Sequence, residues 1–209
     1  MMYKFLFLLC LSFILTACTQ NTNEQAPAAS EAVAEQSLPE RFPEQFVIRS
    51  KAAGSLRIGE SLPMDSKIFD IEPTVETITE EGMTIEQPLY ILNDASGEAI
   101  YVEAAFDDAK GTFSELIGEI NVVSSDFQTT ENIGVGSSIE AFIKAYPDYQ
   151  IWYTYVSEMY VIESPQSIKA QFLLDPSGFK GELEIESDMT SLQISDFDPA
   201  TKIIRVRLI

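Results

Sequence analysis

The stretch IGVGSSIEAFIKAYPDY, residues 133–149, predicts a turn, a capped helix and a stop in close succession. Ser137 and Glu140 have the S-x-x-E spacing of a capping box, so we expect Ser137 to be the N-cap. Apolar residues at i, i+3, i+4 and i+7 form one stripe, which is typical of a helix packed on a core. These residues are Ile139, Phe142, Ile143 and Tyr146. Pro147 is expected to end the helix.

Apolar runs with strand character surround this helix on both sides. Turn sequences such as 93–97 and 175–178 separate several of them and favour hairpins. The runs are 74–79, 89–92, 100–105, 117–123, 151–156, 160–162, 168–174 and 202–208. Because neighbouring runs joined by short turns pair antiparallel, we predict an α+β fold, mainly antiparallel sheet with short helices.

A second glycine–serine motif indicates an internal repeat. Residues 56–62 and 133–139 share the pattern apolar-x-apolar-Gly-x-Ser-apolar, and residues 63–69 after the first copy are compatible with a short helix. We therefore predict a two-fold repeat of α+β halves at 45–127 and 128–209. Chance similarity between two Gly-Ser turns is the alternative.

Residues 1–17 are predicted to be a signal peptide. Lys4 precedes an apolar run at 5–15, which is too short to span a bilayer of ~30 Å. The sequence Leu-Thr-Ala-Cys that ends at Cys18 resembles the lipobox of bacterial lipoproteins. That resemblance implies that Cys18 carries diacylglycerol through a thioether and is acylated at its N-terminus, typically with palmitate, which anchors it in a membrane. An ordinary secretory signal with a chance cysteine is the alternative.

Residues 18–44 are predicted to form the lipidated cysteine and a flexible tether. They contain mainly small and polar residues, with no aromatic side chain before Phe42. Such a composition buries too little apolar surface to offset the chain entropy of folding. The residue after the cysteine, Thr19, is not Asp, which by resemblance to enteric sorting rules implies the outer membrane. We expect a domain held at the envelope and facing the periplasm.

Composition excludes several classes of function. The chain has no histidine, so Ser-His-Asp and Cys-His catalysis and histidine-ligated metals are excluded. Its two cysteines, Cys10 and Cys18, both fall in the predicted signal and anchor. A net charge of −20 repels nucleic acid. Residues 93–98 offer oxygen ligands without the spacing of a calcium loop, so we expect no metal and no cofactor.

Tyrosines and the only tryptophan cluster just after the helix. The members that we single out for binding are Tyr149, Trp152, Tyr153 and Tyr155. Because side chains alternate along a strand, Trp152 should face one way and Tyr153 and Tyr155 the other. We expect one face in the core and hypothesise that an exposed ring binds an envelope protein or a glycan. A purely structural role for the whole run is the alternative.

Carboxylates are the remaining side chains suited to acid–base catalysis. They stand out at 107–108 and at Glu182, Glu184 and Glu186. Adjacent acids in a loop and alternate acids along a strand are the ordinary solvated pattern. A glycosidase would need two carboxyl groups held ~5–9 Å apart in a cleft. A carboxylate-dependent hydrolase of envelope polymers is therefore the alternative function, and we predict no catalytic residue.

The run IGEINVVSSD at 117–126, followed by the glycine turn at 134–138 and the helix, resembles a family of bacterial envelope lipoproteins that includes the RpoE-regulated lipoprotein. The resemblance covers the lipobox and roughly residues 115–150, and it implies an envelope role without a known activity. More loosely, the helix-plus-sheet pattern is similar to outer-membrane assembly lipoproteins and tandem-repeat inhibitors, which bind proteins. We expect a non-catalytic binding or scaffold module anchored to the membrane through its lipidated N-terminus.

The lipobox generates the first prediction. Cys18→Ser removes the thiol that would carry the diacylglycerol, so fatty-acid labelling should be abolished. The protein should move from the membrane pellet to the soluble or uncleaved fraction. Undiminished labelling of the variant would refute the lipobox.

Overall fold

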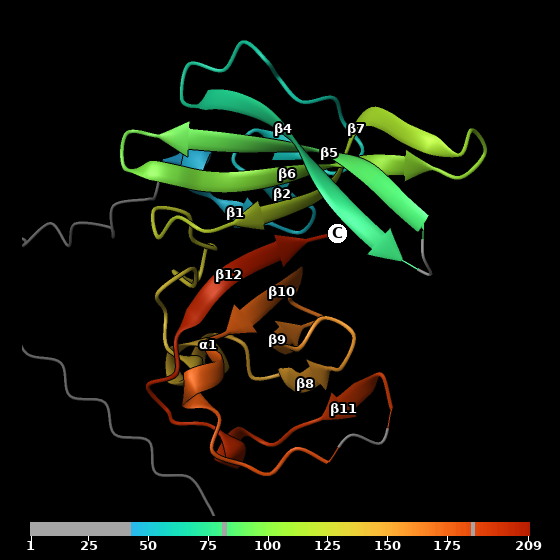
Figure 1. Ribbon diagram of the computed structural model, residues 1–209. Helices are drawn as coiled ribbons and strands as arrows, with labels where there is room; N and C mark the ends of the chain where they lie inside the picture. Colours follow the sequence, from blue (N-terminus) through green and yellow to red (C-terminus); the bar gives the residue numbers. More distant parts are fainter. Residues whose placement is uncertain (1–42, 81–82, 185–186) are drawn as a thin grey trace, which may run out of the picture. The chain divides into compact units, whose positions relative to one another are not determined.

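The structure is a computed structural model that describes residues 43–80, 83–184 and 187–209 (Figure 1). The described residues belong to one compact unit. The predicted signal peptide, Cys18 and the tether lie outside the described residues. No helix among the described residues is long and apolar enough to cross a bilayer.

Nine strands form one antiparallel sheet in the order β11-β8-β9-β10-β12-β7-β6-β5-β4. Their bounds are β4 (Asp70–Glu80), β5 (Met83–Asp94), β6 (Gly97–Asp107), β7 (Thr112–Val122), β8 (Gln150–Thr154), β9 (Met159–Ser164), β10 (Ile168–Leu174), β11 (Met189–Ser191) and β12 (Ile203–Leu208). Each of the eight predicted runs falls largely within one of these strands, so the prediction of an antiparallel sheet is confirmed. Strands β4–β7 fill one end of the sheet and β8–β11 the other, and β12 joins the two ends by pairing with β7 and β10.

The predicted α+β class is wrong, because the described chain is largely all-β. Its one α-helix is α1 (Ile139–Ala145), which has seven residues. The remaining elements are the 3-10 turns η1 (Glu44–Phe46), η2 (Pro176–Gly178) and η3 (Ile194–Asp196), and a small sheet of β1 (Ile48–Arg49), β2 (Ala52–Ala53) and β3 (Leu56–Arg57). A single clear helical pattern therefore suggested more helix than the chain contains.

The second predicted helix, at 63–69, is absent. The Ser66 hydroxyl accepts hydrogen bonds from the backbone N–H groups of Ile68 and Phe69 at 3.2 and 3.1 Å. A serine side chain that bonds nearby backbone in this way competes with helix formation. The first predicted half thus has no α-helix among its described residues, and the boundary at 127/128 stays a prediction.

Helix α1 begins one residue later than predicted. Ser138 is its N-cap, and the Ser138 hydroxyl accepts a hydrogen bond from the Ala141 backbone N–H at 3.2 Å. The Ser137 hydroxyl instead accepts from the Gly134 N–H at 3.1 Å and closes the preceding turn. Glycine is required in that turn, because a Cβ on Gly134 would lie 2.1 Å from the Phe127 carbonyl oxygen.

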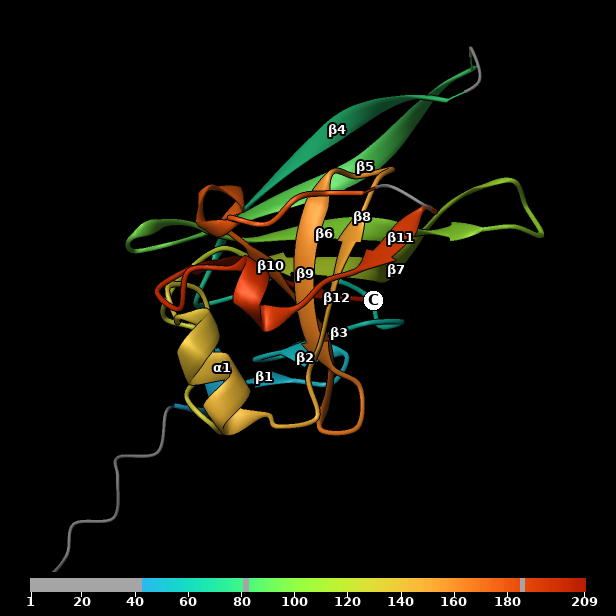
Figure 2. The same ribbon diagram turned by 90° about the horizontal axis from the view of Figure 1, so that it is seen from below.

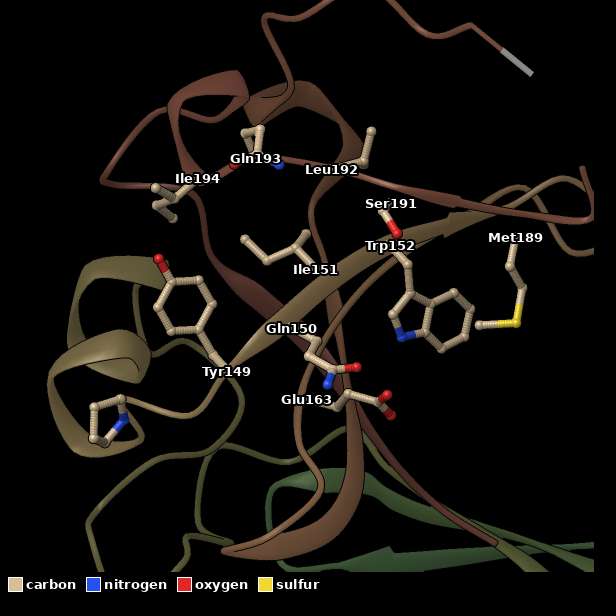
Figure 3. Close-up of a pocket in the computed structure, with 11 residues that line it drawn as sticks. Tyr149, Gln150, Ile151, Trp152, Glu163, Met189, Ser191, Leu192, Gln193 and Ile194 are labelled. Atoms are coloured by element: carbon tan, nitrogen blue, oxygen red, sulfur yellow. The ribbon is translucent and has the colours of Figure 1, made fainter. Parts of the chain in front are cut away.

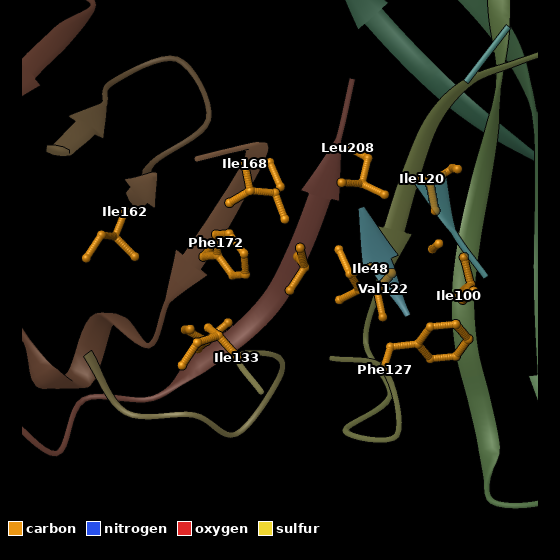
Figure 4. Close-up of a cluster of buried hydrophobic side chains, with 14 of the residues drawn as sticks. Ile48, Ile100, Ile120, Val122, Phe127, Ile133, Ile162, Ile168, Phe172 and Leu208 are labelled. Atoms are coloured by element: carbon orange, nitrogen blue, oxygen red, sulfur yellow. The ribbon is translucent and has the colours of Figure 1, made fainter. Parts of the chain in front are cut away.

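One face of the sheet carries the core (Figure 4). The apolar stripe of α1 packs there: Phe142 is fully buried and meets Phe172 of β10 with ring centroids 4.8 Å apart. Ile48 of β1 and Phe127 lie over the β6–β7 end of the same face. The predicted stripe is therefore confirmed as core, and β1–β3 and α1 together cover this face (Figure 2).

These contacts generate the second prediction. Phe142→Ala should lower the free energy of unfolding by about 3–5 kcal/mol, since it empties a filled core site. Ser138→Ala should lower it by about 1 kcal/mol through loss of the cap. Chemical denaturation measures both, with exposed Lys144→Ala as the control. Equal and negligible losses would contradict the packing of α1.

Candidate functional site

A groove of about 570 Å³ opens beside the first half of β8 (Figure 3). It exists because β11 pairs with β8 over only three residues, Met189–Ser191. The Leu192 N–H then donates to the Ile151 carbonyl at 2.9 Å, and the chain turns away into η3. The Asp196 carboxylate fixes that turn by accepting from the Gln193 N–H at 2.8 Å. The start of β8 is left facing a hollow instead of a strand.

The groove combines aromatic rings with hydrogen-bonding side chains. Tyr149 and Trp152 supply the rings, and Gln150 and Glu163 lie opposite each other on β8 and β9. Ser191 adds a hydroxyl at the β11 wall, and Figure 3 shows the rings and polar groups around one space. Apolar side chains complete the lining: Pro147, Ile151, Met189, Leu192 and Ile194. The arrangement can stack a planar or ring-shaped ligand and bond to its polar edge.

The structure brings two of the four predicted binding residues into this groove. Tyr149 and Trp152 line it, and the buried indole Nε1 of Trp152 has no hydrogen-bond partner among the described residues. Tyr153 is 8% exposed and packs on Tyr160, with ring centroids 4.9 Å apart. Tyr155 is 56% exposed in the turn after β8, away from the groove lining. The predicted alternation of Trp152 and Tyr153 is confirmed.

The sequence did not predict the far wall of the groove, which is formed by residues 189–194. Met189 and the segment that follows it lie some forty residues beyond Trp152 in the chain. No local pattern links the two segments, because β11 has three residues and is too short for its alternation to distinguish it from a loop. Glu163 was also missed, although its strand was predicted.

A second cluster of polar side chains crosses β5, β6, β7 and β12. The Asn121 amide donates to Glu103 Oε1 at 3.2 Å and to Glu119 Oε1 at 2.7 Å. The Gln87 amide donates to Glu103 Oε2 at 2.9 Å. The Arg207 guanidinium donates two hydrogen bonds to Glu119, from Nε to Oε1 at 2.7 Å and from Nη2 to Oε2 at 2.6 Å.

This paired-acid cluster is better suited to structure than to catalysis. Burial, and then the negative charge of Glu119, raise the pKa of Glu103 above its ordinary value. Each of the four carboxylate oxygens accepts a hydrogen bond from a protein donor, which favours a role in holding the four strands together. The cluster shares no lining residue with the groove.

The other acids singled out in the sequence also have structural or solvated positions. Asp107 accepts from the Ala109 N–H at 3.1 Å and pairs with Lys110 at 2.7 Å, which stabilises a turn. Glu182 and Glu184 are exposed, and Glu186 lies outside the described residues. In the part of the chain that the structure describes, no group of three or more His, Cys, Asp or Glu side chains could hold a metal ion.

Comparison with solved structures includes a weak similarity at the level of the fold. The crystal structure of the uncharacterized protein yfeY from Escherichia coli aligns with this chain at a TM-score of 0.47 and 14% sequence identity. The alignment covers 78% of this chain and 98% of that chain. No protein-family model matches the chain, and no curated protein matches it.

The raised pKa of Glu103 generates the third prediction. The folded protein holds this proton more tightly than the unfolded chain, whose carboxyl has the ordinary pKa of 4.5. The resulting stabilisation is fully present below that pH and is lost as the pH rises through the raised pKa. Glu103→Gln stays neutral, so its free energy of unfolding should exceed that of the wild type at neutral pH.

The two proteins should converge in stability in acid, below the ordinary pKa of the carboxyl. Urea unfolding across the pH range measures this, and Glu115→Gln, an exposed acid on β7, is the control. A variant that is less stable than the wild type at neutral pH would show that the hydrogen bonds of ionised Glu103 outweigh its burial.

Proposed function

We propose that this chain is a lipid-anchored protein of the bacterial cell envelope that acts as a non-catalytic binding module. The signal and lipobox at Cys18 support the anchor, and Thr19 supports the outer membrane with the domain facing the periplasm. The motif at 117–138 supports membership of the envelope family that includes the RpoE-regulated lipoprotein. The groove beside β8 is the proposed ligand site.

The observation that carries the proposal is the composition of the groove. Two rings, that of Trp152 on β8 and that of Tyr149 just before β8, stand beside amide, carboxylate and hydroxyl groups. The backbone edge of β8 is already paired with β11 from Trp152 to Thr154, and the Ile151 carbonyl already accepts a hydrogen bond from the Leu192 N–H. Since most of that edge is already paired, the proposal assigns recognition to the side chains of the groove.

A glycan chain suits such a groove best. The apolar face of a sugar ring packs on an aromatic ring, while its hydroxyl and acetamido groups bond to side-chain amides and carboxylates. Gln150, Glu163 and Gln193 supply these groups here. The net charge of −20 opposes polyanionic chains, so the proposed ligand is a neutral or amine-bearing saccharide.

The fourth prediction tests the groove with Trp152→Ala. Removal of the indole should weaken binding of a soluble, neutral oligosaccharide of N-acetylglucosamine by at least tenfold, or about 1.4 kcal/mol. Titration calorimetry on the purified protein in detergent measures the affinity. The thermal melt should change little, because Trp152 is only partly buried.

Neighbouring residues supply the matched controls. Tyr155→Ala removes an exposed ring outside the groove and should leave affinity and melt unchanged, whereas Tyr153→Ala should lower stability because that ring is buried. Equal losses of affinity in Trp152→Ala and Tyr155→Ala would contradict the groove as the site. Capture of a defined polypeptide that Trp152→Ala abolishes, without glycan binding, would assign the groove to a protein partner instead.

A further inference from the structure

The β4–β5 hairpin extends beyond the sheet as a two-stranded ribbon. β4 and β5 pair from Asp70↔Asn93 to Glu80↔Met83, whereas β5 pairs with β6 only from Leu89 to Asp94. Figures 1 and 2 show the ribbon diverging from the β6–β7 hairpin. Residues 72–77 of β4 and 84–86 of β5 are all exposed, so both faces of the ribbon meet solvent. A two-stranded ribbon without a buried face has little stability of its own.

Two prolines show which backbone groups of the ribbon point outward. Pro73 lies opposite Tyr90, and Pro88 lies opposite Val75. Since proline has no N–H, both must occupy pairs that exchange no hydrogen bonds across the two strands. Such pairs alternate along an antiparallel ladder. The N–H and C=O groups of Val75, Thr77 and Thr79 therefore point away from β5, toward the open edge of β4.

This edge is long, and no described strand covers it. β4 has eleven residues, it is the last strand of the sheet, and no described strand pairs with its outer side. An open edge of this length is a template for another strand, and proteins that must avoid such pairing shorten, bulge or cover it. Only Pro73, near the base of the ribbon, interrupts the row of outward-pointing backbone N–H groups on β4.

The charge of the ribbon indicates what kind of strand it can accept. Residues 70–94 contain seven Asp and Glu and no Lys or Arg. A second copy of this chain is disfavoured, because it would bring together two acidic ribbons that have no Lys or Arg to pair with the acids. A cationic strand would instead face Glu72 and Glu76 on one side and the exposed Val75 on the other.

We propose that the outer edge of β4 binds an extended, cationic segment of another protein by strand addition. The main-chain groups of Val75, Thr77 and Thr79 bond to the incoming strand. Alternate lysine or arginine side chains of that strand pair with Glu72 and Glu76, and its apolar side chains pack on Val75. This site is separate from the groove, which lies at the opposite end of the sheet order.

A pair of peptides tests the proposal, with fluorescence anisotropy on the purified full-length protein. A peptide of alternating lysine and valine should bind, and its affinity should fall as salt is added. A peptide of alternating glutamate and valine should not bind. The lysine peptide interrupted by two central prolines should not bind either, because it cannot form a strand. Equal binding of the intact and the proline-interrupted lysine peptide would show that general charge attraction explains the binding, and it would overturn the proposal.

Thr77→Pro is the decisive variant. It removes an outward N–H without breaking the β4–β5 ladder, as Pro73 already does, and should weaken peptide binding at least tenfold. Glu76→Gln should weaken it and reduce its salt dependence, while Glu115→Gln on β7 should change nothing. Slower backbone hydrogen exchange across residues 70–80 in the wild type with peptide provides a readout that needs no variant.

Unchanged binding by Thr77→Pro would overturn the proposal, as would an absence of exchange protection in β4. Dimerisation of the free protein that Thr77→Pro abolishes would assign the edge to a second copy and likewise overturn it. Trp152→Ala should leave peptide binding intact, so a failure of the groove and a failure of this edge are distinguishable.

Discussion

The pairing of β12 with β7 is the interaction on which the sheet depends. β12 is the last strand of the chain, yet it lies between β10 and β7 and joins the two ends of the sheet. Val206 lies opposite Val122 in the core. On the other face, Arg207 donates a hydrogen bond to each carboxylate oxygen of Glu119. A bidentate pair of this kind fixes direction and distance together, which sets the register of the joining strand. Without β12 the two ends of the sheet would share no strand pairing among the described residues.

The two ends of the sheet differ because their outer strands differ in length. At one end β11 is too short to cover β8, and the uncovered part becomes a groove lined by rings and amides. At the other end β4 and β5 extend past β6, and the overhang becomes an acidic ribbon with an open edge. Mismatch of strand lengths therefore produces both candidate surfaces on a continuous sheet. The first surface is suited to side-chain recognition and the second to main-chain recognition.

Negative charge has different consequences at different depths of this molecule. On the ribbon, exposed acids leave the edge open to a cationic partner and discourage self-association. In the cluster of Glu103 and Glu119, partly buried acids are held by Asn121, Gln87 and Arg207, so their charge is neutralised or shared. The same residue type is thus a recognition element in one place and a cross-strand link in the other. Every oxygen of these two acids has a protein donor, which favours a structural role for the cluster.

The sequence by itself determined the strands, the stripe of α1 and the identity of the excluded chemistries, because these depend on local periodicity and on residue types that are present or missing. It also placed Trp152 and Tyr153 on opposite faces through simple alternation. It overestimated the helix content, since the hydrogen bonds that the Ser66 hydroxyl accepts from nearby backbone depend on atomic distances. It also named Ser137 instead of Ser138 as the cap of α1, a choice that depends on distances in the same way. Only the tertiary structure decided the insertion of β12, the far wall of the groove at Met189, and the overhang of β4. The first two arise from pairing between segments far apart in the chain, and the overhang arises from the point at which β5 stops pairing with β6. No local pattern encodes which strand a segment meets or where that pairing ends.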